Sequence, residues 1–339
     1  MIAPGKTIAA FGEVVLRLSV AEGELVLQSA GFEAHVGGAE ANVAVALAAL
    51  GRPTRMIGAL PAGAIGDGVA SELRRHGVDT GTIARPAGRM GLYYHMSGGP
   101  MRPAEVVYDR ADSAFATMAP GDWDWDALLA GTGWLHLSGV TPALGPASAE
   151  AALAAVRAAR ALGIGVSFDG NWRGRLWERW HRDPAAILRP IVAEATLLFG
   201  NHRDAALLLG RDFSGDGPDR RREAACALLD AFPNLETIAS TAREIVDPAT
   251  HRIAARIDRR DGDAQTPAMT IAGITDRIGT GDAFAAGVLD GLFAGMAPLA
   301  AAERGLALAA LKHGLRGDFA PFSRATLDNA SGAAHDVAR

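Results

Sequence analysis

Short apolar runs alternate with alanine-rich stretches along most of this chain of 339 residues, and this alternation restricts the fold more than any other feature. The runs read TIAAFG, TRMIGAL, WLHLSGV, IGVSFDG, ATLLFGN and ETIAS. The stretches between them carry apolar residues at helical spacing, as in AEAALAAVRAARALG. Strands that alternate with helices favour a mostly parallel sheet covered by helices on both faces. The sequence therefore predicts an α/β fold.

Two segments interrupt the alternation and have the pattern of exposed strands. They cover about residues 14–36 and 90–116, alternate in polarity and contain turn glycines. We interpret them as one small β lid over the mouth of the sheet, which would exclude water from a bound ligand. Residues 1–339 then form a single domain with a discontinuous lid. Because uncovered strand edges seek partners, homo-oligomer formation through the lid is a further expectation.

Composition excludes several classes of partner. The formal net charge of -5 comes without a basic run, which argues against nucleic-acid binding and against an acidic membrane surface. No stretch reaches the ~18 apolar residues of a membrane-spanning helix, and the first residues lack the pattern of a secretion signal. Cys226 is the single cysteine and cannot form an internal disulfide. We therefore expect a cytoplasmic protein.

The most specific local signal is the segment ITDRIGTGDAFAAGVLDGLFAG, in which a strand-like run leads through glycines into a helix. Gly279 and Gly281 permit a tight turn whose amide hydrogens can point at a phosphate. Asp282 follows in the first helical turn, where the helix dipole favours an ionised carboxylate. Such a carboxylate can accept a hydroxyl proton during phosphoryl transfer. An aspartate there can equally cap the helix, and these residues alone leave both interpretations open.

Other nucleotide-binding patterns are missing from the sequence. A Walker A loop is absent, and no dinucleotide fingerprint follows the first strand. The GAIGDG at residues 63–68 comes late and lacks the required glycine spacing, so we interpret it as a surface loop. P-loop enzymes and nicotinamide-dependent oxidoreductases are accordingly disfavoured.

At this point a family resemblance can be stated. DRIGTGDAFAAG resembles the second signature of the PfkB-type carbohydrate kinases, and HVGGAEANVAVALAALG resembles the first. The likeness extends over most of the chain, and it is similar to the 2-keto-3-deoxygluconate kinases of that family in GEVVLRL, GRMGLYY, VVYDRADSAF, WLHLSGVTPAL, VSFDGNWRGRLW and ALKHGLRGDF. The resemblance implies a ribokinase-like three-layer α/β/α sandwich with a small β-sheet lid. It also implies transfer of a phosphoryl group from ATP, with Mg²⁺, to a sugar acid, and leaves a monovalent cation open.

Residues of the second signature take the catalytic roles that the resemblance implies. Asp282 matches the catalytic base of the family. Gly279, Thr280 and Gly281 match the anion hole that stabilises charge on the transferring phosphate, and Thr280 stands where Ala or Gly is commoner.

Residues of the first signature match positions that approach the sugar. Gly37 and Gly38 match the close approach of the backbone, and Asn42 would present its amide to the sugar hydroxyls. A tightly packed helix start is the alternative explanation, above all for Asn42.

Two arginines discriminate between an acidic and a neutral sugar. Arg110 in YDRADS and Arg173 in NWRGRLW match substrate-contacting positions of the 2-keto-3-deoxygluconate kinases. A guanidinium binds a carboxylate through two parallel charged hydrogen bonds, which a neutral hexose does not offer. An ordinary surface ion pair is the alternative for each arginine. Trp172 replaces the usual Tyr beside this arm, which leaves the exact sugar acid open.

The remaining expected sugar contacts lie on the lid and near the carboxyl ends of the strands. Tyr108 shares a strand face with Arg110 and could cover the sugar. Tyr93 matches a sugar-contacting position, but the sequence does not decide whether Tyr93 or Tyr94 faces inward. The resemblance assigns Val140 to an apolar wall and Asp318 to a hydroxyl acceptor.

The nucleotide side departs from the family pattern. FGNHRDAALLLG resembles an Asn-x-x-Glu segment that helps to organise Mg²⁺, with Asn201 retained and Asp204 in the acidic position. Ser240, Thr241 and Arg243 replace a glycine-rich nucleotide loop, and of these Ser240 and Arg243 can hold phosphate oxygens. Lys312 lies where the family closes the nucleotide pocket and is a further candidate for ATP contact. No zinc-type Cys/His spacing is found in the sequence.

The sequence thus predicts an ATP-dependent 2-keto-3-deoxygluconate kinase. The alternatives are a kinase of 2-keto-3-deoxygalactonate, fructose or ribose, or a non-catalytic sensor of sugar or nucleotide, which the altered nucleotide loop suggests. The retention of Asp282 argues against a sensor, because a sensor has no use for a catalytic base.

Overall fold

A computed structural model describes residues 6–99 and 101–330 of the chain. Its large sheet has the strand order β14-β13-β12-β11-β10-β9-β1-β4-β5, with β15 beside β13 and β6 beside β4. The strands from β12 through β1 to β5 in this order run parallel to one another. Strands β13, β14 and β15 are antiparallel to their neighbours. The strands are β1 (Thr7–Phe11), β4 (Thr54–Ala59), β5 (Val78–Asp79), β6 (Ile83–Ala84), β9 (Thr132–Ser138), β10 (Gly165–Asp169), β11 (Leu197–Phe199), β12 (Thr237–Asp247), β13 (Thr250–Arg259), β14 (Gly262–Gln265) and β15 (Met269–Ala272).

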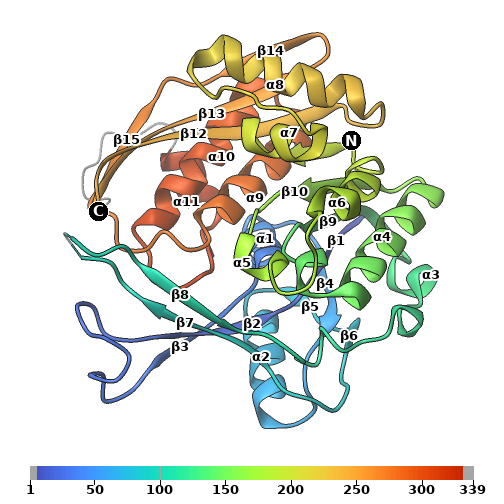
Figure 1. Ribbon diagram of the computed structural model, residues 1–339, viewed down its shortest axis with the longest axis vertical. Coiled ribbons are helices and arrows are strands. Elements are labelled where there is room, and N and C mark those ends of the chain that lie inside the picture. Colours follow the sequence, from blue (N-terminus) through green and yellow to red (C-terminus); the bar gives the residue numbers. More distant parts are fainter. Residues whose placement is uncertain (1–5, 100, 331–339) are drawn as a thin grey trace.

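Helices cover both faces of this sheet (Figure 1). One hydrophobic core joins the sheet to α4 (Pro146–Ala161), α6 (Pro184–Val192), α7 (His202–Leu209) and α8 (Gly217–Ala231). A second core joins the sheet to α1 (Ala39–Ala49), α9 (Thr280–Phe293), α10 (Pro298–His313) and α11 (Arg324–Ala330). The predicted three-layer α/β/α sandwich is confirmed. The shorter elements are α3 (Trp125–Leu128), α5 (Gly174–Trp177) and two 3₁₀ turns, Pro120–Asp122 and Pro142–Leu144.

The prediction of a surface loop at residues 63–68 is wrong. Gly63 precedes α2 (Ala64–Arg75), and the segment forms the first turns of this helix. A Cβ at Gly66 would clash with the main-chain oxygen of Pro61. Gly66 therefore allows α2 to pack closely against Pro61, and it does not form a turn.

A second sheet forms the lid. Its strand order is β3-β2-β7-β8, from β2 (Val15–Ser19), β3 (Glu33–Gly37), β7 (Gly91–Met96) and β8 (Glu105–Asp109). The small β lid of the predicted fold is thereby confirmed, and Figure 1 shows it beside the main body as a sheet of its own. Pro100, within the predicted segment 90–116, lies outside the described residues.

Helix α9 is enclosed by its neighbours. It is buried over ten consecutive residues between α1 and α10. At Gly287 an added Cβ would lie 2.7 Å from the Cα of Gly305, so two glycines bring the backbones of α9 and α10 into contact. Close backbone contact leaves little freedom for helix movement. The residues at the start of α9 are therefore held on a rigid support.

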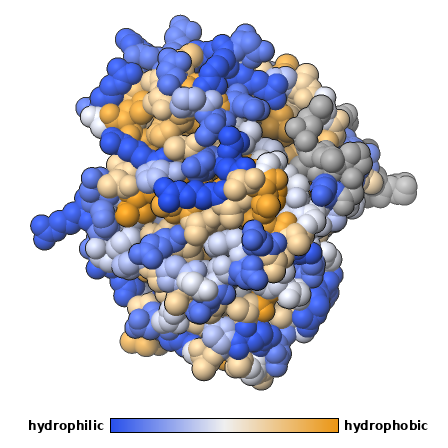
Figure 2. Space-filling model, turned by 90° about the vertical axis from the view of Figure 1, so that its right-hand side faces the viewer, coloured by the Kyte–Doolittle hydropathy of each residue, from blue (hydrophilic) through white to orange (hydrophobic). Residues whose placement is uncertain are grey.

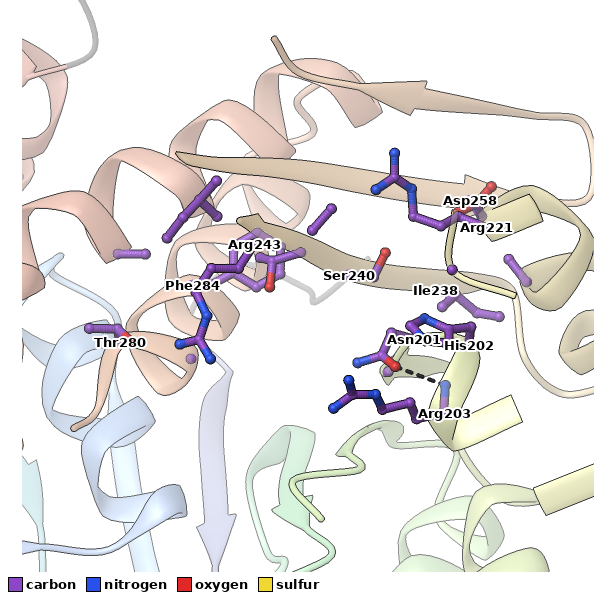
Figure 3. Close-up of a pocket in the computed structure, with 18 of the residues that line it drawn as sticks. Asn201, His202, Arg203, Arg221, Ile238, Ser240, Arg243, Asp258, Thr280 and Phe284 are labelled. Carbon is purple, nitrogen blue, oxygen red and sulfur yellow. Dashed lines mark hydrogen bonds between the residues drawn. The ribbon is translucent and has the colours of Figure 1, made fainter. Parts of the chain in front are cut away.

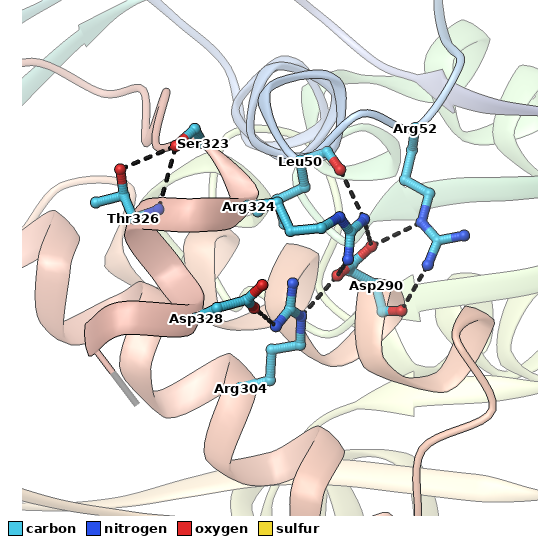
Figure 4. Close-up of polar contacts among 8 residues, drawn as sticks. All are labelled: Leu50, Arg52, Asp290, Arg304, Ser323, Arg324, Thr326 and Asp328. Atoms are coloured by element: carbon cyan, nitrogen blue, oxygen red, sulfur yellow. Dashed lines mark hydrogen bonds and ion pairs between the residues drawn. The ribbon is translucent and has the colours of Figure 1, made fainter. Parts of the chain in front are cut away.

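One aspartate in α9 binds three arginines (Figure 4). The buried Asp290 accepts hydrogen bonds from Arg52 (2.6 Å), Arg304 (2.6 Å) and Arg324 (2.8 Å). Arg304 also reaches Asp328 in α11 at 2.6 Å. This cluster ties α9, α10, α11 and the segment after α1 together.

Removal of this aspartate should be costly for stability. Asp290→Ala leaves the buried Arg304 without its inner partner, so we expect the free energy of unfolding to fall by about 3 kcal/mol. Asp328→Ala removes a carboxylate that is 54% exposed and should lower it by less than about 1 kcal/mol. Urea unfolding of both variants measures the difference. Equal losses would contradict a stabilising role of the inner aspartate.

The surface mixes hydrophilic and hydrophobic residues. Figure 2 shows a face on which hydrophilic residues predominate and hydrophobic residues form smaller separate areas. Within the described residues, no helix has the length and apolar character that a bilayer crossing requires.

Candidate active site

The carboxyl ends of the parallel strands meet the start of α9 and the inner side of the lid. The strand order reverses beside β1, whose neighbours are β4 on one side and β9 on the other. Open α/β sheets bind ligands outside the carboxyl ends of their strands near such a reversal. Two cavities open at this edge, and both are lined by Gly281 at the start of α9.

The glycine loop has the geometry of an anion cradle. Gly279 precedes α9 with φ 80°, and a Cβ there would clash with the main-chain oxygen of Asp318. A Cβ at Gly281, in contrast, would meet no protein atom within 4 Å, so open space lies beside the first turn. Helix starts carry free amide hydrogens and positive potential. The arrangement suits a phosphate group.

Asp282 lies in this first turn and is buried. Its Oδ2 accepts a hydrogen bond from Asn42 Nδ2 at 2.6 Å. Burial raises the pKa of Asp282 to about 7, whereas Asn42 and the charge of Arg173 act to lower it. Gly279 occupies the N-cap of α9, and no side chain caps this helix end. The cap interpretation of Asp282 is therefore not supported, and the residue is placed to act as a base.

Asn42 differs from the expectation. Its amide nitrogen, expected to face sugar hydroxyls, binds Asp282 instead, because α1 and α9 pack side by side. Its Oδ1 is buried without a hydrogen-bond partner. An unpaired buried acceptor of this kind fits a ligand hydroxyl.

The pH dependence of activity should report on Asp282. A carboxyl group accepts a proton only above its pKa, so we expect kcat/KM to fall about tenfold per pH unit below pH ~7. Asn42→Ala removes a hydrogen bond that lowers this pKa, and the acid limb should move to higher pH. Profiles of kcat/KM for both proteins measure the shift. An unmoved limb would contradict its assignment to Asp282.

Asp169, at the end of β10, is a site residue that the sequence interpretation missed. It lines the cavity beside β10 together with Asp204. Burial, followed by the charges of Asp282 and Asp204, raises its pKa to about 8. The sequence does carry a signal for Asp169, because the apolar run VSFDG ends in an acidic residue.

The lid contributes Tyr93 and not Tyr94. The hydroxyl of Tyr93 donates to Asp318 Oδ2 at 2.6 Å, and its ring lies 6.3 Å from that of Tyr108. Tyr94 packs against Phe32 with ring centroids 5.7 Å apart. The inward tyrosine is therefore Tyr93, beside Tyr108 and Asp318.

Two glycines of the first signature make room for this arrangement. A Cβ at Gly37 would clash with the Asp318 carboxylate. Gly38 has φ 135°, and a Cβ there would lie 2.5 Å from the main-chain oxygen of Glu13. Neither position accommodates a side chain.

The two discriminating arginines differ in their surroundings. Arg110 is buried, and its Nε donates to Glu13 Oε2 at 2.6 Å, while Ser113 donates to the other Glu13 oxygen. Its terminal nitrogens have no hydrogen bond within the described part of the chain. Arg173 is exposed and lowers the pKa of both Asp282 and Asp169. Arg173 therefore acts as a positive charge near Asp282, whereas the charge of Arg110 is paired with Glu13.

Val140 follows β9 and is buried in the first core. Its neighbours Ser138 and Thr141 donate hydrogen bonds to Glu40 at 2.8 and 2.9 Å. These hydrogen bonds to Glu40 hold the turn that carries Val140 in place.

The cavity beside α8 is basic on several sides (Figure 3). Arg203 at the start of α7, Arg221 on α8 and Arg243 on β12 line it, with Ser240. Ser240 and Arg243 lie on a strand and not on a loop, because β12 continues into a long hairpin with β13. Burial and the positive charges of Arg277 and Arg203 lower the pKa of Arg243. This excess of positive charge suits a polyphosphate.

Lys312 does not line this cavity. It is fully buried, and its ammonium group donates to the main-chain oxygen of Leu315 at 2.8 Å. Its side chain also lies beside Gly279, and the expected contact with ATP stays a prediction. His313, the next residue, lines the cavity instead.

The carboxylates near the cavities fit a hydrated Mg²⁺. In residues 6–99 and 101–330 no group of three or more His, Cys, Asp or Glu is arranged to hold a metal. Asp204 Oδ2 accepts the main-chain amide hydrogen of Asn201 at 2.8 Å, and Asp204 and Asp169 both line the cavity beside β10. Mg²⁺ commonly keeps several waters and binds one or two carboxylates together with substrate phosphates.

Comparisons with known proteins agree with this geometry. A 2-dehydro-3-deoxygalactonokinase of Haloferax volcanii is 34% identical over 314 residues, which are 92% of each chain. A crystal structure of 2-dehydro-3-deoxygluconokinase from Thermotoga maritima is 32% identical, with a TM-score of 0.91 over 97% of this chain and 100% of that one. Fructokinase from Xylella fastidiosa, solved with bound ATP, shares the fold with a TM-score of 0.78 at 22% identity, over 96% and 98% of the chains. The model of the pfkB family carbohydrate kinases matches residues 5–323, and the chain belongs to this family of kinases.

Proposed function

We propose that this sugar-acid kinase transfers the γ-phosphoryl group of ATP to 2-keto-3-deoxygluconate, giving the 6-phosphate, with Asp282 as the general base. The observation that carries the choice of an acid is Arg110. It is buried, oriented by Glu13, and has terminal nitrogens free of protein hydrogen bonds among the described residues. A guanidinium in this state suits a carboxylate better than a neutral sugar.

The arrangement of the site supports the following course for the proposed reaction. Asp282 takes the proton from the sugar hydroxyl as the hydroxyl oxygen bonds to the γ-phosphorus. The bond from the γ-phosphorus to the bridging oxygen of ATP breaks, and ADP leaves with that oxygen. Amide hydrogens at Gly279, Thr280 and Gly281 stabilise the charge on the transferring group. Mg²⁺, when bound, neutralises negative charge on the phosphates.

We assign ATP to the cavity beside α8. Asn201, Ser240 and Arg243 line it, next to the start of α9. Asp204 is assigned to the hydrated Mg²⁺ through the oxygen that does not cap α7. Sugar contacts are assigned to Tyr93, Tyr108, Arg110, Arg173 and Asp318, with Gly37 and Gly38 as the backbone approach, Asn42 Oδ1 as a hydroxyl acceptor and Val140 as the apolar wall.

A second candidate substrate is 2-keto-3-deoxygalactonate. It is supported by the 34% identity to the Haloferax volcanii 2-dehydro-3-deoxygalactonokinase, since 2-dehydro and 2-keto denote the same group. The two acids differ at one hydroxyl. Both acids carry the carboxylate that Arg110 and Arg173 would bind.

The test is ADP release with Mg-ATP and four acceptors, namely the two keto-deoxy acids, fructose and ribose. The proposal expects turnover on a keto-deoxy acid, with the gluconate derivative preferred. Preference for the galactonate derivative selects the second candidate. Activity on neutral sugars alone contradicts the acid pocket but not the base. ATP binding without turnover of any acceptor would favour a sensor.

A further inference from the structure

Arg17 on lid strand β2 is bound by two segments of the main body. It is only 1% exposed. Its Nη2 donates to Asp276 Oδ2 at 2.7 Å, and its Nε lies 3.1 Å from Asp318 Oδ1. Asp276 precedes the glycine loop, and Asp318 follows α10. One lid side chain therefore joins three separate parts of the site.

Asp276 shapes the start of the glycine loop. Its Oδ1 accepts the amide hydrogen of Ile278 at 2.9 Å, and its Oδ2 also accepts that of Gly317 at 3.2 Å. An aspartate that binds the amide two residues later forms a tight local turn. This turn leads directly into Gly279, where α9 begins.

Asp318 packs against the opposite side of the same loop. Its main-chain oxygen fills the space where a Cβ of Gly279 would lie, and its carboxylate fills that beside Gly37. The carboxylate also accepts the hydroxyl of Tyr93. Asp318 thus contacts the glycine loop, the first signature and the lid together.

The two aspartates need a cation between them. Burial opposes ionisation of Asp276, but its hydrogen bond from Arg17 lowers the pKa below the ordinary value. Burial raises the pKa of Asp318, and Arg17 and Lys312 act against that rise. Titratable groups near the pair include Tyr93, His95, Asp282 and Lys312. Removal of the guanidinium would leave two buried carboxylates that repel each other.

We propose that Arg17 is a positioning residue, which holds the glycine loop and the sugar-side carboxylate Asp318 in register with the lid. Through Asp276 it sets the anion hole, and through Asp318 and Tyr93 it sets the sugar pocket. The inference rests on the proposed kinase reaction but not on the identity of the sugar.

The test compares Arg17→Lys with a matched control, Arg304→Lys. Arg304 is 6% exposed and also bridges two aspartates, Asp290 and Asp328, but away from the glycine loop (Figure 4). An ammonium group lacks the planar fork that binds two carboxylates, so both variants should lose a similar amount of Tm. Arg17→Lys should lower kcat about tenfold or more and raise the sugar KM about fivefold. Arg304→Lys should leave both within about twofold.

Equal kinetics of the two variants at equal loss of Tm would overturn the proposal and leave Arg17 a purely structural residue. If Arg17→Lys does not fold, Asp276→Asn and Tyr93→Phe test the same idea separately. Asp276→Asn should lower kcat more than it changes the sugar KM, and Tyr93→Phe should do the reverse. If both variants change kcat and the sugar KM in the same way, the proposal is also overturned.

The acceptor for these assays is whichever of the four compounds the unaltered enzyme phosphorylates fastest. An enzyme that acts on a neutral sugar alone contradicts the proposed substrate, while the ratios between variants still decide the role of Arg17. The two failures are therefore distinguishable.

Discussion

Asp282→Asn should lower kcat by about 10³-fold, because the amide has the shape of the carboxylate but cannot accept the hydroxyl proton. The glycine loop and both cavities stay as they are, so the KM for ATP should remain within about twofold. Single-turnover measurement of phosphosugar formation separates this loss of chemistry from any change in product release.

Asp328→Asn serves as the control for this variant. Its carboxylate is exposed and belongs to the cluster around Asp290, away from the start of α9. It should keep kcat within about twofold. A loss below about tenfold in Asp282→Asn would mean that the residue does not act as the base.

Arg110→Met should lower kcat/KM for the keto-deoxy acid by about 10²-fold or more, since the substrate carboxylate loses a charged donor in a buried pocket. Activity on a neutral sugar should change much less. Competition between the acid and fructose in one assay measures the change of selectivity directly.

Glu13 complicates this prediction, because it loses its own partner in Arg110→Met. The double variant Glu13→Gln, Arg110→Met removes the stranded charge and should recover Tm without recovering kcat/KM for the acid. Equal losses on acid and neutral sugars, or recovery of acid activity in the double variant, would contradict a direct contact between Arg110 and the carboxylate.

The order of strands and helices and the phosphate end of the site could be predicted because their signals are local. The glycines around Asp282 are neighbours in sequence, and each apolar run forms a strand by itself. The partners of these residues could not be predicted. Asn42 lies 240 residues before Asp282, and nothing in the sequence of α1 shows which way its amide points.

The wrong prediction of a loop has a similar origin. The glycines at 63–68 indicate a turn locally, but Gly66 is required by the packing of α2 against Pro61. The sequence of α10 likewise does not show that Lys312, whose contact with ATP stays a prediction, binds the main chain of Leu315. In both cases tertiary packing decides what the local pattern leaves open.

The bond between Arg17 and Asp276 joins residues 259 positions apart, and this separation has a consequence for synthesis on the ribosome. The first half of the lid leaves the ribosome well before both aspartates that bind its guanidinium, which follow at least 259 residues later. Until then the nascent lid carries a charge without its native partners, and contacts of such long range form slowly. An active site assembled this way becomes competent only after both distant segments have been synthesised.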